Sequence, residues 1–120
     1  MKVFDSFAWV EYFAGSQKGL RVKEIVEDSE IIYTPTICLT EINAKYLREG
    51  RDPKERLEFI EDRSLVLPID RDIALVAGEF KVSLKLHTTD ALIYATGVSR
   101  ECEVVTGDPH FKGLEKVILI

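Results

Sequence analysis

Short apolar runs alternate along the chain with longer stretches in which apolar residues recur every three or four positions. The short runs are typical of buried strands, and the longer spacing is typical of amphipathic helices. The pattern predicts strands within residues 1–5, 30–34, 65–69, 103–106 and 117–120. It predicts helices over residues 6–15, 17–28, 35–50, 70–83 and 89–100, a further helix from Pro53, and a short turn-helix over 109–114.

This order of elements indicates an α/β protein. Short apolar strands separated by helices favour a central, mostly parallel sheet of about five strands, with helices on both faces in a three-layer α/β/α arrangement. We expect one domain over residues 1–120, because the pattern is interrupted by neither a linker nor a low-complexity segment. In such sheets, ligands bind at the carboxyl ends of the strands, where the strand order reverses.

Two local expectations follow from the spacing. Phe7, Val10 and Ala14 lie on one side of the first predicted helix, and Trp9, Tyr12 and Phe13 crowd the same helix. We expect most of these three aromatic residues to pack in the core, and an exposed remainder would suit a partner helix or a second subunit. Pro35 suits the first turn of a helix, and Thr34 before it is a candidate N-cap.

Composition narrows the class of protein. Apolar residues make up 46% and charged residues 31% of the chain, as in soluble globular proteins. The N-terminal apolar stretch contains Asp5 and Glu11, so we do not expect a signal peptide, and we expect a cytoplasmic protein without a membrane span. Cys38 and Cys102 lack metal-ligand spacing and fit core positions. The net charge of −5 argues against a general nucleic-acid coat protein.

Four acidic residues stand out, although each has an ordinary structural explanation. Asp5 can cap the helix that follows it. Glu41 can form a surface pair with Lys45 one turn later, Asp90 suits the dipole of a first helical turn, and Asp108 precedes a proline, as at many turns. Taken one by one, these explanations do not account for the joint pattern. Three of the acids stand where a strand or loop leads into a helix, and the fourth, Glu41, projects from a largely apolar helix.

If the first and fourth strands are neighbours, Asp5 and Asp108 meet at one edge of the sheet. Carboxylates that converge repel one another unless a cation lies between them. A donor set of hard oxygens selects Mg²⁺ or Mn²⁺. Such a site suits phosphodiester hydrolysis, because the cation lowers the pKa of bound water and stabilises charge on the phosphate.

Four motifs in order resemble the PIN-domain family, in particular the VapC-type toxin ribonucleases. They are VFDS at 3–6, TPTICLTE at 34–41, TTDALIYA at 88–95 and VVTGDPHF at 104–111. The resemblance covers nearly the whole chain and implies a PIN-like fold. It also implies a metal-dependent endoribonuclease that uses water attack on RNA, often as a homodimer inhibited by a small antitoxin protein.

The resemblance assigns roles to individual positions. The acidic metal-binding set of the family, which is also its catalytic set, matches Asp5, Glu41, Asp90 and Asp108. Ser6 and Thr106 match hydroxyl positions that support the first and last acids. Gly107 stands where many relatives carry a larger polar residue, and His110 stands where some carry another acid. A lone histidine in this position is more often a turn residue than a ligand.

A basic stretch, residues 81–89, precedes Asp90. Its Lys81 and Lys85, with Lys45 and Arg48, can form a basic lip that neutralises RNA phosphates. The alternative is that these lysines are solvated at a helix C-terminus, where cations are favoured.

Other classes of protein remain open at this stage. A phosphatase or receiver-like domain also places an aspartate after the first strand, but the phosphatase pattern needs a second one two residues later, where Phe7 stands. A non-catalytic RNA- or protein-binding module and an RNA-processing nuclease that is not a toxin are further alternatives. Retention of all four acids argues against the non-catalytic module.

Overall fold

A computed structural model describes residues 1–120, and its centre is a sheet of five parallel strands in the order β3-β2-β1-β4-β5. The strands are β1 (Lys2–Phe4), β2 (Ile32–Pro35), β3 (Leu65–Leu67), β4 (Glu103–Thr106) and β5 (Val117–Leu119). All five predicted strands are present, and the third is two residues shorter than expected. Its entire length pairs with β2, so pairing ends where β2 ends.

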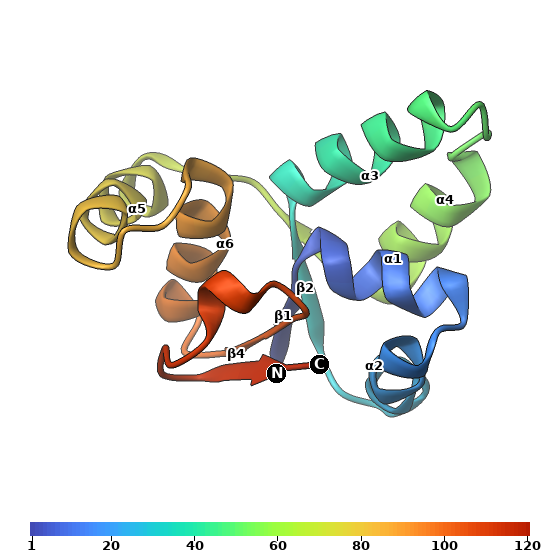
Figure 1. Cartoon of the computed structure of the whole chain (residues 1–120), viewed down its shortest axis with the longest axis horizontal. Coiled ribbons are helices and arrows are strands. Elements are labelled where there is room, and N and C mark those ends of the chain that lie inside the picture. Colours follow the sequence, from blue (N-terminus) through green and yellow to red (C-terminus); the bar gives the residue numbers. More distant parts are fainter.

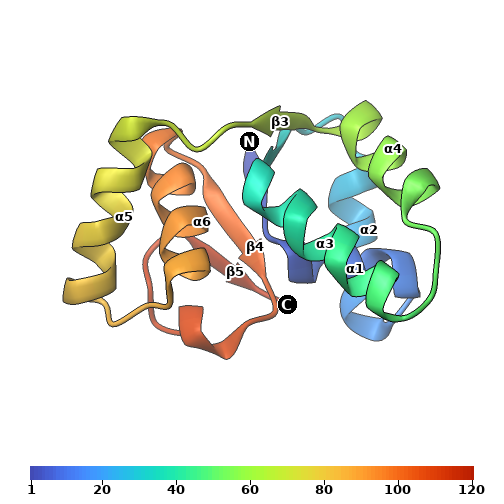
Figure 2. The ribbon, with the colours of Figure 1, turned by 90° about the horizontal axis from the view of Figure 1, so that it is seen from above.

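Six α-helices cover the sheet, with α1–α4 on one face and α5 and α6 on the other (Figures 1 and 2). They are α1 (Ser6–Ala14), α2 (Gln17–Glu27), α3 (Thr36–Arg48), α4 (Lys54–Arg63), α5 (Arg71–Ser83) and α6 (Thr88–Ser99). A 3₁₀ turn, η1 (Pro109–Phe111), follows β4. The predicted three-layer α/β/α architecture is therefore confirmed. No helix is long and apolar enough to cross a membrane.

The two central strands supply side chains to both cores. Val3 and Val104 pack beneath α5 and α6, whereas Phe4 and Val105 pack beneath α1–α4. Since neighbouring residues of a strand point to opposite faces, a strand covered on both faces must be apolar at every position. This double burial explains the continuous apolar runs in the sequence.

The first helix buries Trp9, as expected, but it does not bury the side that carries Phe7 and Ala14. Ala8 and Trp9 are fully buried, Ala14 is exposed, and Phe7 is 36% exposed. The indole Nε1 of Trp9 donates a 3.1 Å hydrogen bond to Thr34 Oγ1 inside the core. This bond between α1 and β2 joins residues far apart in sequence, and it holds Trp9 toward the sheet.

Thr34 therefore does not cap α3, contrary to the expectation. Strand β2 continues through Pro35, and that proline occupies the N-cap position without a side-chain hydrogen bond. The Thr34 hydroxyl is buried and also lies 2.7 Å from the hydroxyl of Ser64, ahead of β3. A residue in a buried strand turns its hydroxyl to the core, where it needs hydrogen-bond partners.

Strands β1 and β4 are direct neighbours, as the meeting of the acids requires. Phe4 pairs with Val105, and the main-chain N–H of Asp5 donates to the Val105 carbonyl at 3.2 Å. The residues that follow the two strands consequently lie at the same edge of the sheet.

Candidate metal centre

Asp5 is the innermost of the four acids and is only 4% exposed. It caps α1, since its Oδ1 accepts a 2.8 Å hydrogen bond from the main-chain N–H of Ala8. Burial raises the pKa of Asp5 to about 7, and the negative charges of Asp108 and Asp90 add to that rise. Hydrogen bonds from Thr106 and Ala8 act in the opposite direction. Asp5 is thus both a helix cap and a carboxyl held next to two other acids.

Thr106, the last residue of β4, connects two of the acids. Its hydroxyl donates to Asp5 Oδ2 and accepts a 3.0 Å hydrogen bond from the main-chain N–H of Asp108. The hydroxyl is fully buried, so these two partners fix its orientation. This geometry supports the expected role of Thr106 in positioning the first and last acids.

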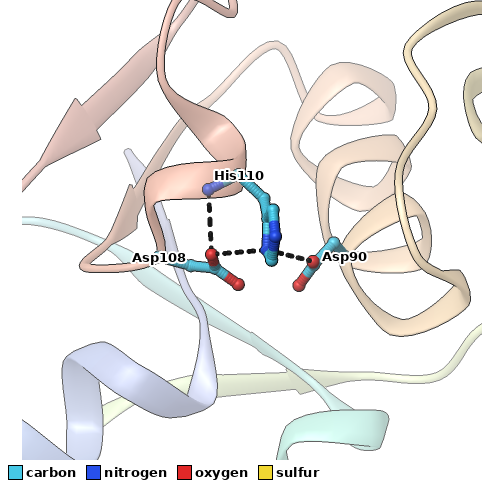
Figure 3. A group of neighbouring side chains, drawn as sticks. All are labelled: Asp90, Asp108 and His110. Atoms are coloured by element: carbon cyan, nitrogen blue, oxygen red, sulfur yellow. Dashed lines mark hydrogen bonds and ion pairs between the residues drawn. The ribbon is translucent and has the colours of Figure 1, made fainter.

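Asp90 and Asp108 come together from the start of α6 and the turn after β4. One carboxylate oxygen of each lies within 4.8 Å of the other and of a ring nitrogen of His110 (Figure 3). The Asp90 and Asp108 side chains are 15% and 27% exposed, so the pair opens to solvent. Asp108 also caps η1, because its Oδ1 accepts a 2.9 Å hydrogen bond from the main-chain N–H of His110.

The electrostatics of Asp90 show which charges face it. Burial is the largest cause that raises the pKa of Asp90, followed by the negative charge of Asp108. His110 and His87 act in the opposite direction, and Glu41 raises the pKa further. Glu41 therefore faces the same site from α3, although it lies outside the tight group formed by Asp90, Asp108 and His110.

Glu41 is held by Ser6, which was expected to support the first or last acid instead. The Ser6 hydroxyl, in the first turn of α1, donates a 2.7 Å hydrogen bond to Glu41 Oε1. The expected surface pair between Glu41 and Lys45 does not form, because Lys45 pairs with Glu49 one turn further on. The carboxylate of Glu41 thereby stays directed toward α1 and the sheet edge.

A groove of about 350 Å³ lies between α1 and α3 beside Glu41. Lys45 and Arg48, two of the four residues of the predicted basic lip, line this groove. Phe7 lines it too, because its ring packs over Gly107: a Cβ at Gly107 would lie 2.3 Å from that ring.

On the other side of the site, the Lys81 ammonium is tied to Thr88 Oγ1 at 2.8 Å, at the start of α6. Lys85 is exposed. Thus the four candidate basic residues belong to two separate segments, one on α3 and one on the stretch from α5 to α6. Whether they bind RNA stays a prediction.

The donor set fits a divalent cation. Asp90 and Asp108 contribute carboxylate oxygens, which Mg²⁺ and Mn²⁺ prefer, and a ring nitrogen of His110 lies beside them. The Asp90 carboxylate accepts no hydrogen bond from the protein, and its one ion-pair contact is with the His110 ring, at 3.9 Å. A partly buried carboxylate with so few favourable contacts is expected where a bound cation compensates its negative charge.

Sequence reasoning missed the inward direction of the His110 ring and the contact between Phe7 and Gly107. The only local signal for the latter was the glycine itself, at a position where a larger residue was expected. His110 stands two residues after Asp108 in the sequence, but the direction of its side chain depends on the geometry of the turn.

The profile of the PIN domain family matches residues 2–117. The chain belongs to the PIN domain family. The five-stranded parallel sheet with helices on both faces agrees with this membership. A search of curated proteins found no match.

Solved structures share the PIN fold at low sequence identity. A toxin-antitoxin complex from Klebsiella pneumoniae is 20% identical, with a TM-score of 0.83 over 98% of this chain and 96% of that one. VapC20 of Mycobacterium tuberculosis, a toxin that cleaves the sarcin-ricin loop, is 15% identical, with a TM-score of 0.77 over 98% and 97% of the two chains. VapBC2 from Rickettsia felis, bound to a promoter DNA fragment, is 16% identical, with a TM-score of 0.75 over 99% and 96%.

Proposed function

We propose that this PIN domain protein is a metal-dependent endoribonuclease and the toxin of a toxin-antitoxin pair. The observation that carries the proposal is the convergence of Asp90 and Asp108 at the carboxyl edge of the sheet, with Asp5 directly behind them. These carboxylates arrive from β1, α6 and the turn after β4, and Glu41 faces them from α3. Their mutual repulsion needs a cation, and a cation at this edge suits phosphodiester cleavage.

Asp90 and Asp108 would hold the cation directly, because their oxygens are the nearest to each other and open to solvent. Asp5 and Glu41 would complete the metal-binding set from behind and from the side of α3. Bound Mg²⁺ or Mn²⁺ lowers the pKa of a water molecule and stabilises charge on the phosphate. The protein would orient that water through its carboxylates.

Hydroxyl groups keep two of these carboxylates in place. Thr106 donates to Asp5, and Ser6 donates to Glu41. Because each hydroxyl occupies one oxygen of its acid, the other oxygen keeps a fixed direction. We therefore assign Ser6 and Thr106 positioning roles rather than contact with the RNA.

The RNA would reach the acids between the two basic segments. Lys45 and Arg48 line the groove beside Glu41, and Lys81 and Lys85 flank the start of α6. Phosphate contacts of this kind supply affinity that falls with salt concentration. Replacing Lys81 and Lys85 by alanine should weaken RNA binding and flatten its salt dependence; an unchanged slope would reject their role.

The toxin assignment draws on the structural relatives. The Klebsiella pneumoniae structure is a toxin-antitoxin complex, and FitAB, 20% identical with a TM-score of 0.71, was solved bound to a DNA fragment. By analogy, we infer a small antitoxin protein as partner, a homodimer and a location in the cytoplasm. Co-expression with the product of a short neighbouring reading frame, followed by purification, tests the antitoxin directly.

Cleavage of a mixed structured RNA by the purified protein, with Mn²⁺, Mg²⁺ or a chelator, tests the nuclease. We expect cleavage that requires the metal and disappears in Asp90→Asn, while Asp62→Asn, an exposed acid on α4, cleaves as the wild type does. Absence of cleavage by folded, inhibitor-free wild type would reject the proposal in favour of a binding module. Cleavage that survives Asp90→Asn would show that the site is assigned wrongly.

A further inference from the structure

The imidazole of His110 points between the two carboxylates that open to solvent (Figure 3). Its Nδ1 lies 2.9 Å from Asp108 Oδ1 and 3.9 Å from Asp90 Oδ2. The side chain is 60% exposed and lies at the surface of η1, yet its ring nitrogen faces inward, toward the acids. One nitrogen donor thus joins two oxygen donors in a single small cluster.

The turn itself does not need this ring. The main-chain N–H of His110 donates to Asp108 Oδ1 at 2.9 Å, and the main-chain N–H of Phe111 donates to the Asp108 carbonyl at 3.1 Å. Any residue with a main-chain N–H at position 110 can make the first of these bonds. The position of the ring therefore calls for an explanation other than capping.

The two distances from the His110 nitrogen to the carboxylates match those between ligands of one cation. Octahedral ligands about 2.1 Å from a small divalent cation lie about 3 Å apart when adjacent and about 4.2 Å apart when opposite. The His110 nitrogen falls at 2.9 Å from one carboxylate and 3.9 Å from the other, within this range.

We propose that Nδ1 of His110 is a direct ligand of the divalent cation bound by Asp90 and Asp108, and that the site consequently favours Mn²⁺ over Mg²⁺. The inference rests on the proposed function for the presence of a cation at this edge. Its chemical reason is that imidazole nitrogen binds transition metals far better than it binds Mg²⁺, which prefers oxygen. With the neutral ring bound through Nδ1, the proton resides on Nε2, which faces away from the cation.

A second histidine provides a matched control. The ring of His87, which precedes α6, lies edge-to-face with that of His110, at 5.2 Å between centroids. His87 does not belong to the group of donors within 4.8 Å of one another. Replacing His87 removes an imidazole from the same corner of the protein without removing a proposed ligand.

Mn²⁺ added to the tag-free, full-length protein allows the ligand to be detected without any activity assay. Pulsed electron paramagnetic resonance detects coupling of the Mn²⁺ electron spins to a directly bound ¹⁴N nucleus. We expect this coupling in the wild type and in His87→Ala, and its loss in His110→Ala and His110→Asn. Calorimetric titration should show that His110→Ala lowers Mn²⁺ affinity about 10-fold, with a much smaller change for Mg²⁺. Loss of Mn²⁺ binding in Asp108→Asn places the ion at this site.

Mn²⁺ bound at this site without ¹⁴N coupling, or with coupling that persists in His110→Ala, would overturn the inference. In that case metal-dependent cleavage that is lost in Asp90→Asn would still uphold the proposed function, so the two can fail separately. Absence of Mn²⁺ binding by the folded wild type would overturn the inference and, together with absence of cleavage, the proposed function as well.

Discussion

The burial of Asp5 predicts that removing its charge stabilises the metal-free protein. The pKa of Asp5 is raised from 3.8 to about 7, chiefly by burial. The folded state holds the Asp5 proton more tightly than the unfolded state does. The contribution of this proton to the free energy of unfolding is therefore complete below pH ~4, and it is lost as the pH rises to about 7. A shift of this size corresponds to about 4 kcal/mol.

Asp5→Asn removes this pH-dependent loss of stability, but the substitution itself lowers the free energy of unfolding by a smaller amount. The amide oxygen can still accept from the main-chain N–H of Ala8. The amide NH₂ instead faces the Thr106 hydroxyl, which already accepts from Asp108 and loses its own acceptor. We assign about 1 kcal/mol to that mismatch. The expected net gain is about 2–3 kcal/mol at pH 8 and close to zero or negative at pH 4.5.

Urea unfolding in chelator, at several values of pH between 4.5 and 8.5, measures this difference. The same substitution at an exposed acid, Asp62→Asn, should change the free energy of unfolding by a small amount that does not vary with pH. Saturating Mg²⁺ or Mn²⁺ should stabilise the wild type more than Asp5→Asn. A difference that stays constant with pH, or an Asp5→Asn protein that is less stable at pH 8, would refute the reasoning and leave Asp5 as a helix cap only.

Three further predictions concern stability and are checked by urea unfolding. Gly107→Ala should cost about 1–3 kcal/mol because its Cβ meets the Phe7 ring, and Phe7→Ala should relieve most of that cost; an equal cost in both backgrounds would contradict the contact. Thr106→Val should cost about 2 kcal/mol, since it leaves a buried N–H and Asp5 Oδ2 without their partner, whereas Thr106→Ser should recover most of it. Arg63→Ala should cost about 2–3 kcal/mol, because Arg63 donates to four main-chain carbonyls in the last turn of α2 and in the segment that leads to β2; full recovery by Arg63→Lys would show that its forked guanidinium is not required.

The sheet and the meeting of the acids could be predicted because both depend on simple local signals. A strand buried on both faces must be apolar throughout, as Val104 and Val105 are, so it is visible in the sequence. Asp5 follows the first of two such strands directly, and Asp108 follows the other after one residue, Gly107. Once those strands are neighbours in a parallel sheet, the acids must share an edge.

The details that failed depend on contacts between distant segments. In the first helix, apolar residues occur on nearly every side, so the spacing cannot decide whether Phe7 or Trp9 faces the core. The hydrogen bond from Trp9 to Thr34 belongs to the arrangement that decides it, and this bond joins α1 to β2.

The pairing of Lys45 could not be predicted for a different reason. Glu41 and Glu49 both lie four residues from Lys45, and the spacing rule favours Glu41, because a glutamate that precedes the lysine is the better orientation. In the structure the Ser6 hydroxyl holds Glu41, and Lys45 pairs with Glu49. The contact between α1 and α3 that redirects Glu41 is tertiary, so local spacing does not predict it.

The proposed function requires a divalent cation, held by Asp90 and Asp108, that contacts the RNA phosphate to be cleaved. Once the cleavage site is mapped, RNA with a single phosphorothioate at that bond tests this contact, because sulfur binds Mg²⁺ poorly and softer cations well. We predict that one of the two diastereomers is cleaved much more slowly in Mg²⁺ and that Mn²⁺ or Cd²⁺ restores its cleavage. Equal cleavage of both diastereomers and the unmodified RNA in Mg²⁺ would contradict the claim.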